Sequence, residues 1–284
     1  MKKIILLMMS VLLVFSIFGC SKAEEDTNTK PNVKPNDKGE EKMNDNIHGL
    51  QIGWNDSRFL DESIPEFMLP YRIYLPEDYS DDKEYPFLFF IHGNGSRGTD
   101  NLSQMNNAKI CDTLIRNYKD IIIVAPQCDK GTSWIDADYK NGNYTITPSM
   151  TANLESALEI FDYWAETLST DSKRYYLFGN SAGGFACYDL LARFPDKWAC
   201  AVPVAGCGDL EQAEKFKDVP IWIHHGTADN LVPYEGSKLM YEKLQSLGAG
   251  DKVLFTTYEG EGHTIFNEVG LNNDVAEWIY SQSK

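Results

Sequence analysis

The sequence predicts an α/β fold in which helices cover both faces of one mostly parallel central sheet. Strand-like segments alternate with helical patterns along most of the chain, and this alternation is typical of parallel sheets. One segment, FLFFI at residues 87–91, is apolar throughout, as expected of a central strand that is buried on both sides. The chain has 284 residues, enough for one large domain and an N-terminal extension.

The first strand is expected in YRIYL, residues 71–75, where polar and apolar residues alternate as in a half-exposed strand. Further strands are expected at 87–91, 121–125, 175–178, 201–205, 221–224 and 252–258. The spacing of apolar residues predicts helices between them, at 103–116, 151–168, 182–193, 234–247 and 274–281. Active residues of such a sheet gather at the carboxyl ends of its strands, so catalytic groups are expected there.

The pattern of residues at the N-terminus indicates a targeting segment. Lys2 and Lys3 precede an apolar run at residues 4–18, which suits a secretory signal and is shorter than a comfortable membrane span. The run ends in IFGC, which resembles a bacterial lipobox with Cys20 as the lipidated residue. We therefore predict a signal peptide at 1–19, a lipidated Cys20 with a disordered tether at 20–46, and a folded domain at 47–284. The alternative is conventional cleavage with Cys20 incidental.

These segments predict a protein of the bacterial cell envelope, anchored to the membrane by lipid, with its domain outside the cytoplasm. The formal net charge of −16 argues against a nucleic-acid partner, because phosphate binding needs clustered Lys and Arg. Five cysteines lie in the predicted domain, in apolar surroundings and without metal-ligand spacing, so most are expected to be small buried residues. A bridge between Cys200 and Cys207 is the alternative for that pair.

A chemical signature lies at the strand-to-helix junction in YYLFGNSAGGFACYDLL, residues 175–191. Gly179, Ser181 and Gly183 form the pattern G-x-S-x-G. A side chain on so tight a turn leaves no room for Cβ atoms two residues before and after it, which explains the glycines. Ser181 is therefore a candidate nucleophile. The alternative role for a serine at this position is to cap the helix.

A candidate acid and a candidate base follow two later strands. Asp229 lies in HHGTADNLVP after the strand at 221, and His263 lies in EGEGH after the strand at 252. A serine hydroxyl needs a base to take its proton, an imidazole suits that task near neutral pH, and a carboxylate orients the imidazole. We therefore predict a triad of Ser181, His263 and Asp229. Asp209 is a rival for the acid, and His263 could instead be a solvated loop residue.

A Gly-rich turn, HGNGSRG at residues 92–98, follows the central strand. Backbone N–H groups of such a turn, with the N–H that follows the nucleophile, can stabilise a developing oxyanion. We expect the N–H groups of Ala182 and Asn94 to form this oxyanion hole, with Gly95 as the alternative to Asn94. A triad and such a hole complete acyl transfer alone, so the sequence implies no cofactor and no metal.

Five segments in order, HGNGSRGTDN, APQCDKGTSW, GNSAGG, HGTADNLVP and EGEGH, resemble the α/β-hydrolase superfamily. More narrowly, they resemble a bacterial group of secreted esterases and predicted peptidases related to feruloyl esterases, acetylxylan esterases and polyhydroxyalkanoate depolymerases. The resemblance implies an α/β-hydrolase fold, with the nucleophile at Ser181, the acid at Asp229 and the base at His263. The stretch at 194–219 leaves little space for a large lid, and no β-propeller precedes the domain, so the likeness to prolyl oligopeptidases is partial.

The expected activity is that of a serine esterase cleaving carboxylic esters, with ester side groups of polysaccharides as one substrate class. Trp134, in GTSWIDADY, could stack on a sugar or a phenolic acyl group, and Tyr144 belongs to the same aromatic loop. A structural tryptophan is the alternative. A surface serine peptidase and a non-catalytic ligand-binding lipoprotein remain the other functions to test, and the sequence implies no particular oligomeric state.

Overall fold

The computed structural model describes residues 47–60, 68–136 and 144–284. The predicted signal peptide at 1–19, Cys20 and the predicted tether at 20–46 lie outside these described residues. None of the helices in the described ranges has both the length and the apolar character needed to cross a membrane.

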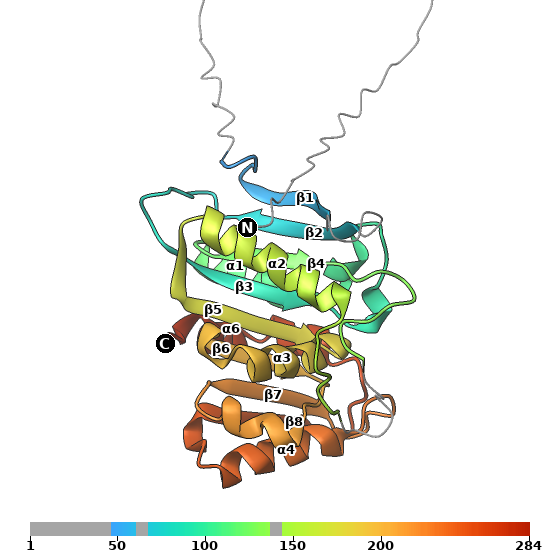
Figure 1. Ribbon diagram of the computed structural model, residues 1–284. Coiled ribbons are helices and arrows are strands. Elements are labelled where there is room, and N and C mark those ends of the chain that lie inside the picture. The colour runs from blue at the N-terminus through green and yellow to red at the C-terminus, as the bar shows by residue number, and fades with distance from the viewer. Residues whose placement is uncertain (1–46, 61–67, 137–143) are drawn as a thin grey trace, which may run out of the picture.

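An eight-stranded sheet forms the centre of the domain, in the order β1-β2-β4-β3-β5-β6-β7-β8 (Figure 1). β2 pairs antiparallel with β1 and with β4, and all other neighbouring strands are parallel, which confirms the predicted mostly parallel sheet. The strands are β1 (Gly53–Leu60), β2 (Met68–Leu75), β3 (Tyr85–Ile91), β4 (Ile122–Pro126), β5 (Thr170–Asn180), β6 (Cys200–Val204), β7 (Ile221–Gly226) and β8 (Val253–Tyr258).

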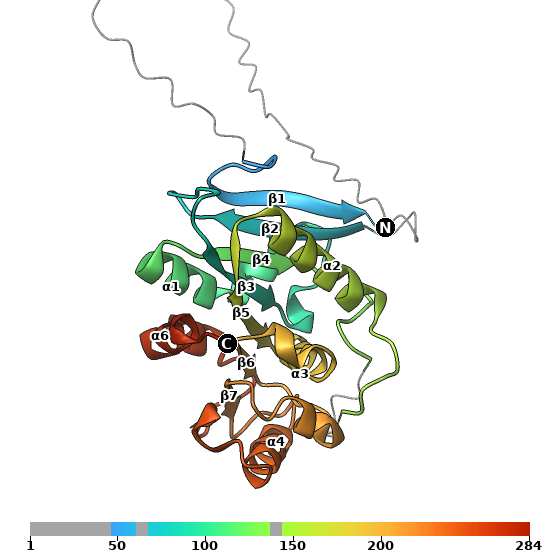
Figure 2. The same cartoon turned by 60° about the vertical axis from the view of Figure 1, so that its left-hand side comes forward.

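Helices cover both faces of the sheet (Figure 2). One face carries α2 (Ala152–Thr167), α3 (Ala182–Arg193) and α4 (Tyr234–Ser246), and the other carries α1 (Lys109–Tyr118), α5 (Phe266–Leu271) and α6 (Asn273–Ser281). In β3, Phe87 and Phe89 belong to the first core and Leu88 and Phe90 to the second. The apolar run FLFFI is therefore buried on both sides because both of its faces meet helices.

Most predicted elements are present, and the differences have local causes. The strand predicted at 71–75 is not half-exposed, because β2 lies inside the sheet between β1 and β4 and only Arg72 in that segment is partly exposed. β1 was not predicted, since its polar residues follow no clear alternation at the edge of the sheet. The helix predicted at 103–116 is divided at Ala108 into the 3-10 helix η2 (Ser103–Asn107) and α1. The short α5 was also missed.

The five cysteines of the described residues are free and buried, so Cys200 and Cys207 form no bridge with each other. Burial raises the pKa of every one of these thiols. They are therefore protonated, unreactive members of the two cores, as the apolar surroundings in the sequence indicated.

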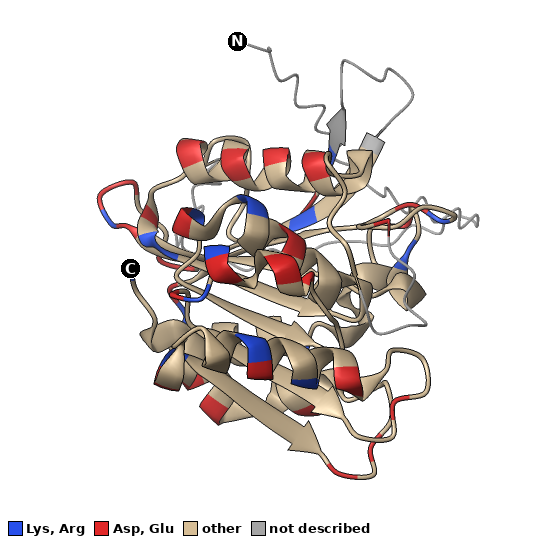
Figure 3. Ribbon diagram, turned by 60° about the horizontal axis from the view of Figure 1, so that its bottom comes forward, with Lys and Arg blue, Asp and Glu red and all other residues tan. Residues whose placement is uncertain are grey.

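Acidic residues outnumber basic ones, 42 to 26, in the full sequence. Figure 3 shows Asp and Glu distributed over several helices and loops, with fewer Lys and Arg between them. With a formal net charge of −16 the protein is strongly anionic.

Candidate active site

The chain turns tightly from β5 into α3 at the carboxyl end of the strand (Figure 1), and Ser181 is the residue between these two elements. Its backbone has φ 55° and ψ −116°, a conformation that side-chain-bearing residues rarely adopt. A Cβ at Gly179 would lie 2.1 Å from the carbonyl oxygen of Gly183, and a Cβ at Gly183 would lie 2.0 Å from that of Ile91. The two glycines therefore allow the turn to pack closely on β3 and α3.

Three side chains from different loops form one hydrogen-bonded chain. The Oγ of Ser181 lies 2.8 Å from Nε2 of His263, and Nδ1 of His263 lies 2.6 Å from Oδ2 of Asp229. The carboxylate of Asp229 can only accept, so Nδ1 of His263 carries a hydrogen. In the neutral ring Nε2 is then free to accept the hydroxyl proton of Ser181.

The carboxylate of Asp229 is buried, with its side chain 0% exposed, and is held from several sides. Oδ1 accepts hydrogen bonds from the N–H groups of Leu231 and Val232, each at 2.9 Å, and Oδ2 lies 3.1 Å from Nε2 of His225. Burial alone would raise the pKa of Asp229, but the bonds to His225, His263 and the two backbone N–H groups outweigh it and hold the pKa below its ordinary value. The carboxylate is therefore ionised and fixed in orientation.

The geometry separates the alternatives that the sequence left open. Ser181 precedes α3, but its side chain makes no capping bond and instead points to His263. Asp209 accepts hydrogen bonds from the N–H groups of Glu211 and Ile146, each at 3.0 Å, and so caps a 3-10 helix and holds a loop. Asp229, not Asp209, contacts the imidazole of His263.

The Gly-rich turn after β3 borders the same site. Asn94 and Gly95 line the pocket above Ser181, and Asn94 opens the 3-10 helix η1 (Asn94–Ser96). Ala182 is the first residue of α3. The first N–H groups of a helix have no partner within that helix, so the N–H groups of Asn94 and Ala182 are candidate donors to a bound oxyanion.

His92 fixes this turn from beneath. Its Nε2 accepts the N–H of Cys128 at 3.0 Å, so its Nδ1 carries the hydrogen and donates to the carbonyl oxygen of Gly93 at 2.7 Å. Burial lowers the pKa of His92 to about 4, against a smaller opposing effect of the bond to Gly93. His92 is thus a neutral structural residue rather than a second base.

A pocket of about 390 Å³ opens over Ser181 and His263. Asn107, Asn180 and Thr264 give it polar groups, while Val232, Phe266 and the 61% exposed Leu231 give it apolar ones. None of the described residues that line it is Asp, Glu, Lys or Arg. The sequence pattern does not identify these lining residues as a group. Leu231 and Val232 are the two it could have indicated, because they lie two and three residues after Asp229 in HHGTADNLVP.

Trp134 is not a ligand-stacking residue in this structure, which corrects the prediction from its loop. It is 1% exposed, its ring packs against His92, and its Nε1 donates to the carbonyl oxygen of His92 at 2.8 Å. Tyr144 is also buried, with its hydroxyl bonded to Asp189 at 2.5 Å. Both aromatic residues brace the loops around the site because their polar atoms find partners inside the protein.

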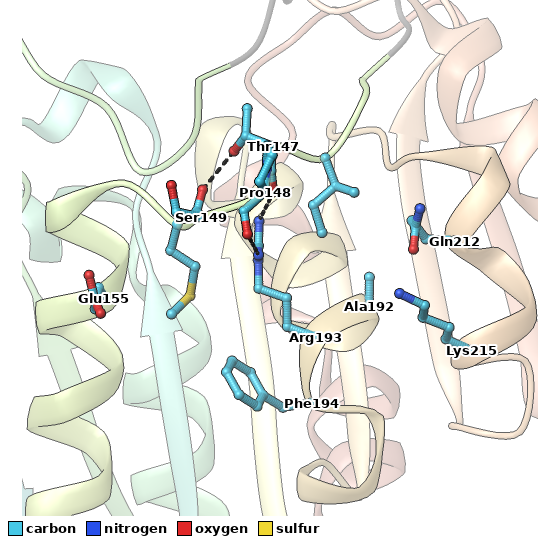
Figure 4. Close-up of a pocket in the computed structure, with 11 residues that line it drawn as sticks. Thr147, Pro148, Ser149, Glu155, Ala192, Arg193, Phe194, Gln212 and Lys215 are labelled. Carbon is cyan, nitrogen blue, oxygen red and sulfur yellow. Dashed lines mark hydrogen bonds between the residues drawn. The ribbon is translucent and has the colours of Figure 1, made fainter.

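A second hollow, larger at about 620 Å³, lies beside the end of α3 (Figure 4). Arg193 points across it and donates to the carbonyl oxygens of Thr147 at 2.6 Å and Pro148 at 3.3 Å, so its guanidinium anchors a loop. No histidine is among the described residues that line this hollow. The smaller pocket is therefore the better candidate for an active site, because a serine hydroxyl and an imidazole meet there.

Among the described residues, no group of three or more His, Cys, Asp or Glu side chains is arranged to hold a metal ion. The polar groups of the site contact one another and the backbone instead. This arrangement can move a proton between a hydroxyl and an imidazole beside the first backbone N–H groups of two helices.

Comparisons with known proteins agree with this architecture. A bifunctional acetylxylan esterase/xylanase from Neocallimastix patriciarum is 31% identical over 77 residues, which is 27% of this chain and 12% of that protein. An uncharacterized secreted protein from Arthroderma benhamiae is 21% identical over 197 residues, 59% of this chain and 20% of that protein. The chain thus spans only a small part of these curated relatives.

Solved structures and a family model cover more of the chain. The crystal structure of a thermostable esterase is 28% identical, with a TM-score of 0.73, and the match covers 81% of this chain and 63% of that one. A mutant of the feruloyl esterase module from Clostridium thermocellum, complexed with sinapinate, shares the fold at 14% identity and a TM-score of 0.59, covering 81% and 88%. The model of the Phospholipase/Carboxylesterase family matches residues 78–280. The chain therefore belongs to the phospholipase/carboxylesterase family and has the α/β-hydrolase fold.

Proposed function

We propose that this protein hydrolyses carboxylic esters through an acyl-enzyme formed on Ser181. The observation that carries the proposal is the continuous hydrogen-bonded chain from the Oγ of Ser181 through His263 to Asp229. The family membership supports the same reaction class. In this proposal Ser181 is the nucleophile, His263 the general base and acid, and Asp229 the residue that orients His263.

The reaction would proceed in two acyl transfers. Nε2 of His263 takes the hydroxyl proton as Oγ of Ser181 attacks the ester carbonyl, and the N–H groups of Ala182 and Asn94 stabilise the oxyanion, with Gly95 as the alternative to Asn94. His263 then gives the proton to the departing alcohol. Water attacks the acyl-enzyme in the second transfer, and His263 again takes and returns a proton, which frees Ser181.

The pocket favours uncharged substrates. Its described lining contains no Lys or Arg to bind a carboxylate or phosphate and no Asp or Glu to bind an ammonium group. Asn94, Asn107 and Asn180 give the lining amide groups, and Leu231 and Phe266 give it apolar side chains. Neutral acyl groups such as acetyl or feruloyl fit this chemistry, and ester side groups of polysaccharides are the substrate class that we propose. The named activities of the acetylxylan esterase/xylanase and the feruloyl esterase module support this choice.

The test compares the protein with Ser181→Ala on p-nitrophenyl acetate, methyl ferulate and short peptide p-nitroanilides. We expect turnover of the esters and complete loss of it in Ser181→Ala, with an unchanged circular dichroism spectrum. Preference for the anilides would indicate a peptidase instead, and no turnover of any substrate would indicate a binding protein. Ester hydrolysis that survives in Ser181→Ala would overturn the choice of nucleophile.

A further inference from the structure

Two imidazoles share one oxygen of Asp229. Oδ2 lies 2.6 Å from Nδ1 of His263 and 3.1 Å from Nε2 of His225. The side chain of His225 is 0% exposed, and His225 belongs to β7, four residues before Asp229. The proposed mechanism uses only His263, so the buried second imidazole needs its own explanation.

The partners of His225 fix the position of a hydrogen. Its Nε2 faces Oδ2 of Asp229 and the carbonyl oxygen of Val232, which is also 3.1 Å away. Both oxygens can only accept hydrogen bonds, so Nε2 of His225 carries a hydrogen in this arrangement.

The other end of the ring is anchored as well. Nδ1 of His225 lies 2.7 Å from Oγ of Ser237 in α4, and that hydroxyl lies 2.7 Å from the carbonyl oxygen of Gly206 after β6. The imidazole is thus held between two structural elements and the carboxylate. A ring fixed in this way can position Asp229 more firmly than a solvent molecule could.

We propose that His225 is a positioning residue, which donates a hydrogen bond to Asp229 and so limits the negative charge that Asp229 presents to His263. This inference rests on the proposed function of the triad. Without the donor, the full charge of the carboxylate would stabilise the protonated ring of His263, which would then stay protonated to higher pH and be lost as a base.

The other titratable groups around this pair do not change charge in the relevant range. Cys207 faces Asp229 from the loop after β6, and burial, with a smaller effect of Asp229, raises the pKa of its thiol to about 12. Tyr234 of α4 packs its ring edge-on against His225, and burial raises the pKa of its hydroxyl above the ordinary value. A shift in the pH profile of activity therefore reports on Asp229 and its two imidazoles.

The experiment measures kcat/KM for p-nitrophenyl acetate against pH in His225→Leu, His225→Gln and Ser237→Ala. His225→Leu removes the donor, and we expect kcat/KM at neutral pH to fall about tenfold or more. We also expect the acid limb, the part of the pH profile where kcat/KM falls as the pH is lowered, to move to higher pH. His225→Gln places an amide N–H near the former Nε2, so we expect it to restore most of the rate and the original limb. Ser237→Ala removes the partner of Nδ1 of His225, so we expect the acid limb to move in the same direction as in His225→Leu, but by a smaller amount.

His224→Leu is the matched control, because His224 is the adjacent residue, is also 0% exposed and does not contact Asp229. Its acid limb should stay where it is in the unchanged protein. An unmoved limb in both His225→Leu and Ser237→Ala would overturn the inference, as would failure of His225→Gln to restore it. If His225→Leu does not fold, Ser237→Ala and His225→Gln decide the question. Activity in Ser181→Ala would instead overturn the proposed function, so the two failures are distinguishable.

Discussion

At the scale of single residues, the same side chain serves different purposes according to its partners. His92 is 0% exposed, accepts one backbone bond and donates another, and has a pKa lowered by burial to about 4. The side chain of His263 is 11% exposed at the pocket and contacts a carboxylate on one side and a hydroxyl on the other. Only the second environment places an imidazole between a carboxylate and a hydroxyl at the pocket, as the proposed role of His263 as a base requires.

The two candidate acids give a prediction at this scale. Asp229→Asn should lower kcat by about 10⁴, because an amide at this position cannot hold His263 in the required tautomer. Asp209→Asn should leave kcat within a few-fold, because Asp209 bonds backbone N–H groups rather than His263. Steady-state kinetics on p-nitrophenyl acetate compares the two variants directly. A larger loss in Asp209→Asn would reverse the assignment.

At the scale of elements, the turn between β5 and α3 shows where sequence reasoning is strong. The predicted helix at 182–193 has the observed bounds, because the glycines mark the turn and the apolar spacing marks the helix that follows. The three triad candidates were identified for the same reason: each follows a strand within a recognisable segment. The sequence leaves Trp134 with a stacking and a structural role, because its burial depends on contacts with His92 that are remote in the sequence.

Other features depend on pairing that the local sequence does not encode. β1 carries Asn55, Asp56 and Arg58, so its pattern does not resemble a strand until it pairs with β2 along its whole length. The lining of the pocket comes from several loops, and residues such as Asn107 and Phe266 join it only through the arrangement of the sheet and helices. Chain order therefore gives the catalytic candidates, but tertiary contacts select the residues around them.

The close packing of the turn between β5 and α3 predicts that a side chain at Gly183 is not tolerated. Gly183→Ala should lower the free energy of unfolding by on the order of 3 kcal/mol and abolish ester hydrolysis, since its Cβ would lie 2.0 Å from the carbonyl oxygen of Ile91 and force the backbone apart. Gly248→Ala is the control: it has φ +86° but open space around the added Cβ, so it should cost only about 1 kcal/mol and keep activity. Urea unfolding measures both. Equal stability of the two variants would contradict a close-packed turn.

At the scale of the whole molecule, the parallel topology brings distant parts of the chain to one edge. Ser181, Asp229 and His263 follow β5, β7 and β8, whose carboxyl ends point in the same direction because these strands are parallel. The same folding places His92 and His224 in the interior, where neither is exposed. The fold that builds the site therefore also buries groups whose charged forms it does not tolerate.

These buried histidines predict that the protein loses stability in mild acid. Burial lowers the pKa of His92 from 6.5 to about 4 and that of His224 from 6.5 to about 3. Between those values and 6.5 the unfolded chain binds more protons than the folded protein, so the free energy of unfolding falls as the pH drops. The loss due to His92 develops from about pH 6.5 to 4, and the loss due to His224 from about pH 6.5 to 3. At pH 4.5 each of these two histidines should lower the free energy of unfolding by about 2 to 3 kcal/mol relative to its value at pH 7.

Urea unfolding at pH 7 and pH 4.5 measures this loss, and His224→Leu identifies its source. Leucine cannot take up a proton, and Nε2 of His224 has no hydrogen-bond partner among the described residues, so the hydrogen bond that the variant gives up is the one between Nδ1 and the hydroxyl of Tyr258. We expect the drop in unfolding free energy between the two pH values to shrink by about half in His224→Leu, since His92 still contributes its share. An undiminished drop would show that acid destabilises the protein through other groups, because replacing His224 removes one of the two buried imidazoles on which the prediction depends.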